Sequence, residues 1–345
     1  MVQGEVTLAA RSRDAARPAA LPLAAVSLAV PLSNPVDRLY LAYFLGLGVL
    51  IFALRQRVPA WPAYLALHVL CLATLLLLAA RARRDRVCSF LHDWYPLAAF
   101  IVCFEEVARL SFLLVDGWQD AGLLALEARL FPVPPTVWLQ QFASPLFTEL
   151  MEVGYFSYFL LLMIVGGVLY GRADRRPFRD IMTASVLSYF SCYAVFLLFP
   201  TEGPAHTLAA QHTVALHGGP FHWAVLLIQR LGGVHGNAFP SSHVAAGVVA
   251  LIFAWRYAPR LGAALTPLVL LLCAGAVYDR YHYFSDVVAG VAVGGLVAGA
   301  VVCRPYGTRA RDSAHPGLRP GLLSTARGAG CTAGPAVPHG EKCRP

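Results

Sequence analysis

Two polar segments, each at the edge of a long apolar run, decide how this sequence folds. The first reads FPSSH at residues 239–243, and the second reads YHYFSD at residues 281–286. Ionisable groups are costly in or beside a bilayer and are seldom kept there without a function. Two histidines, His243 and His282, together with the carboxyl group of Asp286, therefore indicate a phosphate-handling site at a membrane surface.

The composition around these segments is that of a membrane protein. Of the 345 residues, 58% are hydrophobic and only 13% are charged, whereas a soluble domain carries about 25% charged residues. The apolar residues gather into runs of roughly 16–25 residues, the length of a helix that crosses a bilayer. We therefore predict an all-α fold, a polytopic transmembrane helical bundle with about six to eight spans.

The apolar runs and the turns between them divide the chain into four regions. Residues 1–36 form a low-complexity segment, in which no cleaved signal peptide is expected, and residues 37–93 hold two accessory transmembrane helices. Residues 94–303 are the expected membrane-embedded domain with both polar segments, and residues 304–345 a disordered tail rich in Gly, Pro and Arg. The candidate spans cover residues 38–55, 61–80, 94–115, 146–171, 178–199, 241–257, 262–278 and 284–303.

Arginines mark one side of the membrane. They cluster in the turns at residues 81–86, 172–179 and 256–260, which fall on the same side as the C-terminal tail when the spans are counted alternately. By the positive-inside rule this side is cytoplasmic, although Arg55 and Arg57 fall on the other. The composition favours a bacterial inner membrane, with both polar segments facing the exterior. On that outer side, the run from Leu123 to Phe131 could lie flat as an interfacial helix.

The two polar segments can meet at the outer side. Pro240, Ser241 and Ser242 are typical of a helix start, and the unpaired N–H groups of a helix N-terminus bind phosphate readily. From His243 one helix of about 30 Å crosses the membrane and a second one returns. This path brings His282 back to the face that His243 left.

The same geometry assigns roles to the side chains. His282 and Asp286 are four residues apart, so on one face of a helix the carboxylate would accept the imidazole N–H and fix its tautomer. We assign His282 as the nucleophile that forms a phosphohistidine, and His243 as the acid that protonates the leaving alkoxide. Arg280 offers a planar fork suited to phosphate oxygens. A single histidine at a membrane edge is more often an interfacial residue, so the joint pattern carries this hypothesis.

These residues resemble the type 2 phosphatidic acid phosphatase superfamily, and most of all its inositol phosphotransferase branch, which includes inositol phosphorylceramide synthase-like proteins. The Pro-Ser-Gly-His motif of that superfamily is matched at residues 240–243, with Ser242 in place of Gly. Its His-x-x-x-Asp motif is matched by His282 and Asp286. The resemblance implies that the histidine of the later motif is the nucleophile and that of the earlier motif the acid.

The resemblance is specific over residues 199–295 and weaker over 90–198, and it includes two departures. The arginine that the family has six residues before the motif histidine is replaced by Ala276. The family's Lys-x6-Arg-Pro motif is absent, and residues 199–204 occupy its place with His206 as the nearest cation. These departures resemble those of the inositol phosphotransferase branch more than the motifs of typical phosphatases.

The sequence thus predicts an integral membrane lipid phosphatase or phosphotransferase that needs neither a metal nor another cofactor. Its expected partners are a lipid phosphate substrate and the bilayer. Hydrolysis and transfer to an alcohol use the same residues and differ in whether water or another hydroxyl reaches the intermediate; the resemblance favours transfer. The alternative is a non-catalytic membrane protein that binds or carries lipid.

Other polar residues of the outer loops carry weaker signals. Glu202 and His206 either contact a head group or are solvated loop residues. The remaining loop histidines fit no common ligand spacing, so no metal site is predicted. A net charge of +8 without a basic stripe that alternates with aromatic residues gives no indication of nucleic acid binding.

Inside the spans, two patterns predict packing. The spacing of Glu105, Glu106 and Arg109 allows ion pairs within one helix, with a role in substrate passage as the alternative. The Gly-x-x-x-Gly repeats at 290–294 and 295–299 predict a close approach of the last helix to its neighbours.

Overall fold

The long apolar runs fold into helices, as the sequence predicts. The structure, a computed structural model, describes residues 34–232 and 235–304, and every regular element within these ranges is helical. Residues 1–33 and 305–345, which hold most of the expected low-complexity segment and tail, lie outside the described residues. Six helices are long and apolar enough to cross a bilayer: α1 (Pro35–Ala53), α2 (Trp61–Arg81), α3 (Arg86–Arg109), α8 (Arg176–Leu198), α12 (Pro259–Tyr278) and α13 (Phe284–Val302).

The fourth predicted span, residues 146–171, is broken into two helices. α6 (Pro145–Phe156) and α7 (Tyr158–Tyr170) meet at Ser157 with a bend of 43°. The hydroxyl of Ser157 donates to the carbonyl of Gly154 at 2.6 Å. A serine that bonds back to the preceding turn commonly bends a helix, so the break has a local cause.

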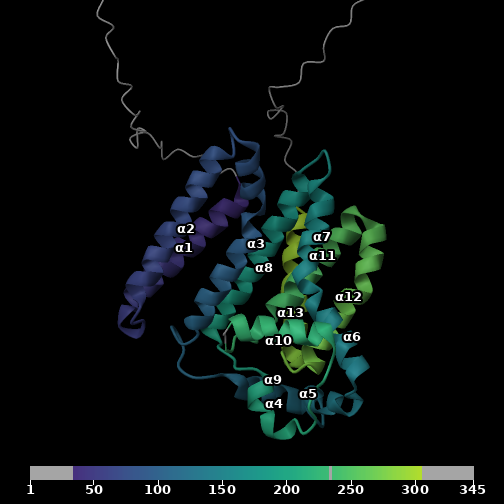
Figure 1. The fold of residues 1–345 in the computed structure, drawn as a ribbon. Coiled ribbons are helices and arrows are strands. Elements are labelled where there is room, and N and C mark those ends of the chain that lie inside the picture. The colour runs from purple at the N-terminus through teal and green to yellow at the C-terminus, as the bar shows by residue number, and fades with distance from the viewer. Residues whose placement is uncertain (1–33, 233–234, 305–345) are drawn as a thin grey trace, which may run out of the picture. The chain divides into compact units, whose positions relative to one another are not determined.

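The helix that follows the FPSSH segment lies in the middle of the bundle. This helix, α11 (Ser242–Tyr257), has 16 residues and is shorter than the six helices that are long enough to cross a bilayer. It packs against α7, α8, α12 and α13, and most of its side chains are buried (Figure 1). The first turn of α11 is thereby held from several sides.

Glycines allow α13 to lie against α11. A Cβ atom on Gly290 would be 2.5 Å from the carbonyl oxygen of Ser241, and one on Gly294 would meet the backbone of α11 as closely. The predicted close approach is confirmed at these two positions. It is wrong for Gly295 and Gly299, where an added Cβ would have no neighbour within 4 Å, because they lie on another face of the helix.

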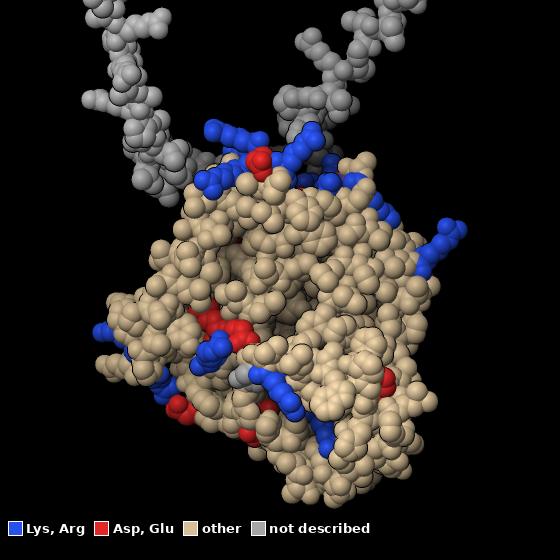
Figure 2. Space-filling model, viewed as in Figure 1, with Lys and Arg blue, Asp and Glu red and all other residues tan. Residues whose placement is uncertain are grey.

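The two ends of the bundle differ in charge. The turns from α2 to α3, α7 to α8 and α11 to α12 lie at one end, where Figure 2 shows a row of basic side chains. Arg57, at the opposite end, pairs with Asp116 at 3.0 Å. The shorter elements lie with both polar segments at that opposite end or on its loops: α4 (Asp120–Leu130), α5 (Pro135–Trp138), α9 (Pro204–Thr207), α10 (Pro220–Gly232) and the 3₁₀ turns Arg55–Arg57, Leu139–Phe142 and Ala209–Gln211.

Two of these shorter helices bear on the predictions for this end of the bundle. The helix predicted over the run from Leu123 to Phe131 is confirmed by α4, which ends at Leu130. The sequence analysis did not predict α10, whose Trp223, Leu227 and Leu231 are exposed and follow one another at four-residue intervals. An exposed apolar stripe of this kind suits a helix that lies in the membrane interface.

Of the two helices predicted to be accessory, α1 contacts α8 directly, whereas α2 packs against α1 and α3. Of the predicted ion pairs, that between Glu105 and Arg109 forms at 2.8 Å. Glu106 faces the other way and is buried. Its carboxylate binds His68 of α2 and accepts the hydroxyl of Tyr43 of α1. One acidic residue of α3 therefore ties three helices together.

Candidate active site

The FPSSH segment forms the start of α11. Ser241 is the N-cap residue, and its hydroxyl accepts the N–H of Val244 at 3.3 Å. The backbone N–H groups of Ser242 and His243 have no acceptor within the described part of the chain. They are available to an anion at the positive end of a helix dipole. The predicted helix start is confirmed, and Ser241 and Ser242 are both buried.

His282 is oriented by backbone groups. Its Nδ1 lies 2.9 Å from the carbonyl oxygen of Ala238. Because a carbonyl oxygen can only accept, Nδ1 of the neutral ring carries the proton and Nε2 carries the lone pair. The backbone N–H of His282 donates to the carbonyl of Ala276 at 2.9 Å. Sequence reasoning missed Ala238, since a backbone acceptor leaves no residue signature.

Asp286 supports His282 in a different way from the one predicted. α13 begins at Phe284, so His282 precedes the helix and the two side chains do not stack on one helix face. Instead, Oδ2 of Asp286 accepts the N–H of Tyr283 at 2.8 Å, which caps α13, and lies 3.5 Å from Nδ1 of His282. The ring's nearer partner is therefore the carbonyl of Ala238, and the buried carboxyl group of Asp286 is its second, more distant partner.

The structure brings the two polar segments together. The backbone N–H of Ser241 donates to the carbonyl of Asp286 at 3.0 Å. The ring centroids of His243 and His282 are 5.9 Å apart. On its other side, Nδ1 of His243 lies 3.4 Å from the hydroxyl of Tyr155. The helical return inferred from the sequence therefore places His243, His282 and Asp286 in one site.

Two acidic residues of α4, Asp120 and Glu127, accept hydrogen bonds from the segments next to the two histidines. Sequence reasoning missed both. Asp120 accepts the backbone N–H groups of residues 202–203 at 2.8 and 2.9 Å and the hydroxyl of Tyr283 at 2.9 Å. Glu127 accepts the N–H and the hydroxyl of Ser285 at 2.8 and 3.0 Å. Two carboxylates seven residues apart share one helix face, and this spacing was the signal available.

Arg280 lies beside a polar pocket of about 350 Å³. Its guanidinium donates to the carbonyl of Val214 in the outer loop. One N–H of the guanidinium that we predicted to bind phosphate is therefore used by the loop that contains Val214. His212 also lines the pocket, and burial, followed by the charge of Arg280, lowers the pKa of His212 to about 4.

Two buried carboxyl groups line the same pocket. Oε1 of Glu152 accepts the hydroxyl of Tyr281 and contacts Nδ1 of His222, both at 2.8 Å. Oε2 of Glu152 and both oxygens of Asp279 have no partner among the described residues. Burial, and then the charge of Glu152, raise the pKa of Asp279 to about 9. The ring of Tyr281 packs 4.4 Å from that of Tyr155, which connects the pocket to His243.

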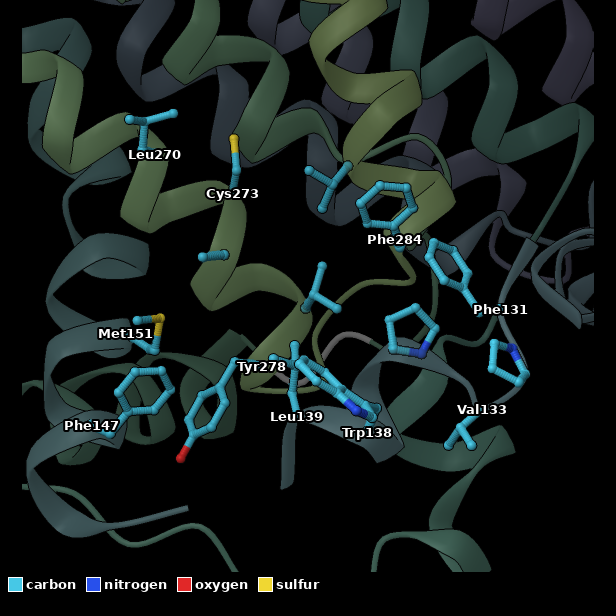
Figure 3. A pocket seen from close by; sticks show the side chains of 15 residues that line it. Phe131, Val133, Trp138, Leu139, Phe147, Met151, Leu270, Cys273, Tyr278 and Phe284 are labelled. Atoms are coloured by element: carbon cyan, nitrogen blue, oxygen red, sulfur yellow. The ribbon is translucent and has the colours of Figure 1, made fainter. Parts of the chain in front are cut away.

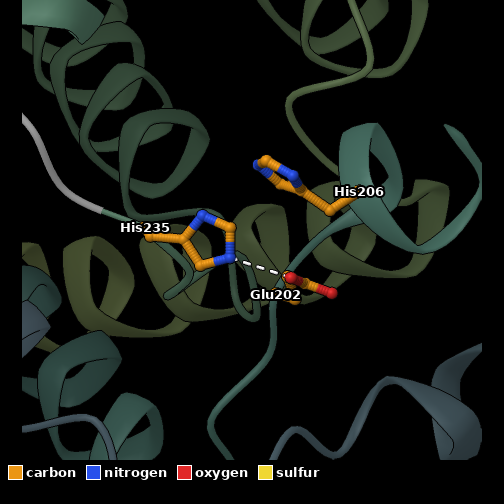
Figure 4. Close-up of side chains that lie close together, drawn as sticks. All are labelled: Glu202, His206 and His235. Carbon is orange, nitrogen blue, oxygen red and sulfur yellow. Dashed lines mark hydrogen bonds and ion pairs between the residues drawn. The ribbon is translucent and has the colours of Figure 1, made fainter.

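Glu202 and His206 lie together with a third loop residue. Oε1 of Glu202 is 2.8 Å from Nε2 of His235. The ring of His206 lies beside that of His235, with centroids 4.2 Å apart (Figure 4). The spacing of the loop histidines in the sequence did not predict this cluster.

An apolar pocket of about 680 Å³ lies next to the turn that carries His282 (Figure 3). Tyr278 and Phe284, on either side of that turn, line it together with Trp138 and with Leu270 of α12. The hydroxyl of Tyr278 is bound to Thr148 outside the apolar space, at 2.8 Å. Figure 3 shows side chains from the α4–α5 segment, α6, α12 and α13 around the pocket.

Comparison with known proteins places these features in a family context. Residues 121–300, a range that contains both polar segments, match the model of the PAP2 superfamily. A PA-phosphatase related-family protein of Dictyostelium discoideum is 23% identical over 189 residues, which are 48% of this chain and 33% of that protein. The chain therefore spans about a third of the length of this relative. No solved structure matches the chain.

Proposed function

Since the chain belongs to the PAP2 superfamily, we propose that it is a membrane lipid phosphatase or phosphotransferase with a phosphohistidine intermediate at His282. The observation that carries this proposal is the orientation of the His282 ring. Its Nδ1 is engaged by the Ala238 carbonyl, so Nε2 keeps the lone pair that a nucleophile needs. His243 lies close enough for one phosphoryl group to reach both rings.

The reaction has two steps. First, Nε2 of His282 attacks phosphorus, the phosphorus–oxygen ester bond breaks, and His243 gives its proton to the leaving alkoxide. Second, a hydroxyl attacks the phosphohistidine, His243 takes the hydroxyl's proton, and the phosphorus–nitrogen bond breaks. The backbone N–H groups of residues 242–243 bind the non-bridging oxygens throughout. The carboxylate of Asp286 stabilises the positive charge that the phosphorylated ring carries.

The polar pocket favours transfer to a polyhydroxylated acceptor of the inositol type. Buried polar atoms are nearly always hydrogen-bonded, yet three carboxyl oxygens of Glu152 and Asp279 have no partner in the described chain. Hydroxyl groups of a polyol would supply those partners. The pocket is lined by Tyr281, the residue before His282 in the chain, so we expect a bound acceptor to approach the intermediate from this side.

The apolar pocket favours a lipid as the phosphate donor. It has room for part of an acyl or isoprenyl chain, and its walls at Tyr278 and Phe284 belong to the turn that carries His282. With the arginine-rich end in the cytoplasm, the site opens to the outer leaflet. We place the protein in a bacterial inner membrane, as its composition suggests.

A product analysis tests the proposal. Purified protein in lipid nanodiscs is offered labelled phosphatidate, an isoprenyl diphosphate and a phosphoinositide, each with and without inositol or diacylglycerol. We expect turnover that vanadate inhibits, and an acceptor-dependent product for at least one pair. His282→Ala should lose both turnover and the acid-labile phosphoprotein. Full activity in His282→Ala would refute the mechanism, and lipid binding without turnover of any substrate would support a non-catalytic protein.

A further inference from the structure

Three side chains with metal-ligating atoms converge on the outer face, beside the proposed active site. Glu202 comes from the loop after α8, His206 from the short helix α9, and His235 from the segment that leads to α11. One ligand atom of each residue lies within 4.8 Å of the others (Figure 4). In Figure 4 the two imidazole rings and the carboxylate face a common space. They are distant in sequence, so the usual ligand-spacing rules could not detect them.

The chemistry of the cluster suits a transition metal. Two imidazoles and one carboxylate are ligands typical of Zn²⁺, with bonds of about 2.0–2.2 Å and a fourth position left for water. In such a tetrahedral site the ligand atoms are about 3.4 Å apart. His206 and His235 are exposed, so small side-chain rotations would draw them together without moving the backbone.

One ligand is already held in place. The backbone N–H groups of residues 202–203 donate to the carboxylate of Asp120, which fixes the turn on which Glu202 stands. Glu202 also already contacts His235. Supporting interactions that orient a ligand are a usual feature of metal sites. We propose that Glu202, His206 and His235 form a binding site for one divalent transition-metal ion, with Zn²⁺ as the best fit.

A bound ion would connect the two segments that support His282. Next to Glu202, the hydroxyl of Thr201 accepts the N–H of Phe239 at 2.9 Å. Between Phe239 and the histidine ligand lies Ala238, whose carbonyl orients the His282 ring. The ion would thus fasten residues 201–206 to residues 235–239 and stabilise that carbonyl. Glu202, His206 and His235 act here as positioning residues, and the ion takes no part in the bond-making steps.

Direct metal binding tests the site without any assumption about catalysis. The full chain, purified with its affinity tag removed, is stripped with a chelator and titrated with Zn²⁺, with Co²⁺ as a visible-absorption probe. We expect one equivalent of Zn²⁺, and at least about 10-fold weaker binding for His206→Ala and for Glu202→Gln. His217→Ala, in the same outer loop and exposed, is the matched control and should bind as the wild type does. Equal binding by all four proteins, or none, would overturn the proposal.

A kinetic experiment tests the positioning role, which rests on the proposed function. Removal of Zn²⁺ should lower kcat for the lipid phosphate more than it raises KM, and added Zn²⁺ should restore it. His206→Ala should be insensitive to both treatments. If the chain binds one Zn²⁺ but turns over no lipid phosphate, the metal site stands and the proposed function fails. If the chelated wild type retains full kcat, the positioning role is refuted while the function stands.

Discussion

Replacing Gly290 with alanine should damage the site through the crossing of α13 and α11. A Cβ at this position would lie 2.5 Å from the carbonyl oxygen of Ser241 and 3.2 Å from Cβ of Val244. Ser241 caps α11 and donates its N–H to Asp286. The substitution therefore acts on the contact between the two segments that carry the histidines.

The expected size of the effect follows from this overlap. A carbon–oxygen contact needs about 3.3 Å, so the two backbones must separate locally by about 0.8 Å. Overpacking of this kind costs about 1–3 kcal/mol, while alanine in place of glycine inside a helix returns about 0.5–1 kcal/mol. The net loss of stability is about 0–2.5 kcal/mol. Because misplacement by about 1 Å lowers a rate about 100-fold, we expect a loss in kcat of about 10- to 100-fold.

Two other glycines of α13 provide controls. Gly295→Ala adds a Cβ with no neighbour within 4 Å, so it should leave kcat unchanged and preserve or slightly raise stability. Gly294→Ala meets the backbone at Ala245, one turn further from the site, and should cost stability with less effect on kcat. Thermal unfolding in detergent and turnover of the lipid phosphate give both quantities. If Gly290→Ala behaves like Gly295→Ala in both, the close crossing at Ser241 is refuted.

Three further changes test particular contacts. The raised pKa of Asp279, about 9, means that between about pH 4 and pH 9 the unfolded chain releases a proton that the folded chain keeps. The stability of the wild type should therefore fall as pH rises through that window. The difference between the melting temperatures of Asp279→Asn and the wild type should increase from pH 5 to pH 8. A difference that stays constant would contradict the raised pKa of Asp279. Glu106→Ala breaks a buried pair and should cost about 3–5 kcal/mol, against about 0.2–1 kcal/mol for Glu105→Ala at a more exposed pair, both read from thermal unfolding; equal losses would disprove the burial argument. Asp120→Ala leaves two backbone N–H groups without an acceptor and removes one of the two partners of the Tyr283 hydroxyl, which keeps Thr207; it should cost about 1–3 kcal/mol and lower kcat, whereas unchanged kinetics would show that α4 does not support the site.

The spans could be predicted from the sequence because the length of an apolar run is a local property. The bend at Ser157 could not, since it depends on one hydroxyl turning back to Gly154. The helix α10 was also missed, because its apolar residues are interrupted and do not form a continuous run. Its stripe of Trp223, Leu227 and Leu231 becomes clear only when every fourth residue is followed.

The site was partly predictable for a similar reason. The separation of His243 and His282 by two helical legs predicts that both lie at one end of the bundle, and the structure places them together there. Their support depends on contacts between distant segments. The carbonyl of Ala238 that orients His282 belongs to no motif, and Asp286 both caps α13 and lies near the ring. From the spacing of His282 and Asp286 alone, a carboxylate that caps α13 could not be distinguished from one that binds the ring directly.

The position of Arg280 changes the electrostatic argument for phosphate binding. One N–H of its guanidinium donates to the carbonyl of Val214 beside the polar pocket, so part of the hydrogen-bonding capacity that the sequence assigned to phosphate is used by the loop. The N–H groups of Ser242 and His243, which have no acceptor among the described residues, lie at the positive end of α11. The proposed acid and the donors to the oxygens would then share one helical turn. A small displacement of that turn should weaken proton transfer and charge stabilisation together, and for this reason we expect a backbone contact such as that of Gly290 to affect kcat more than KM.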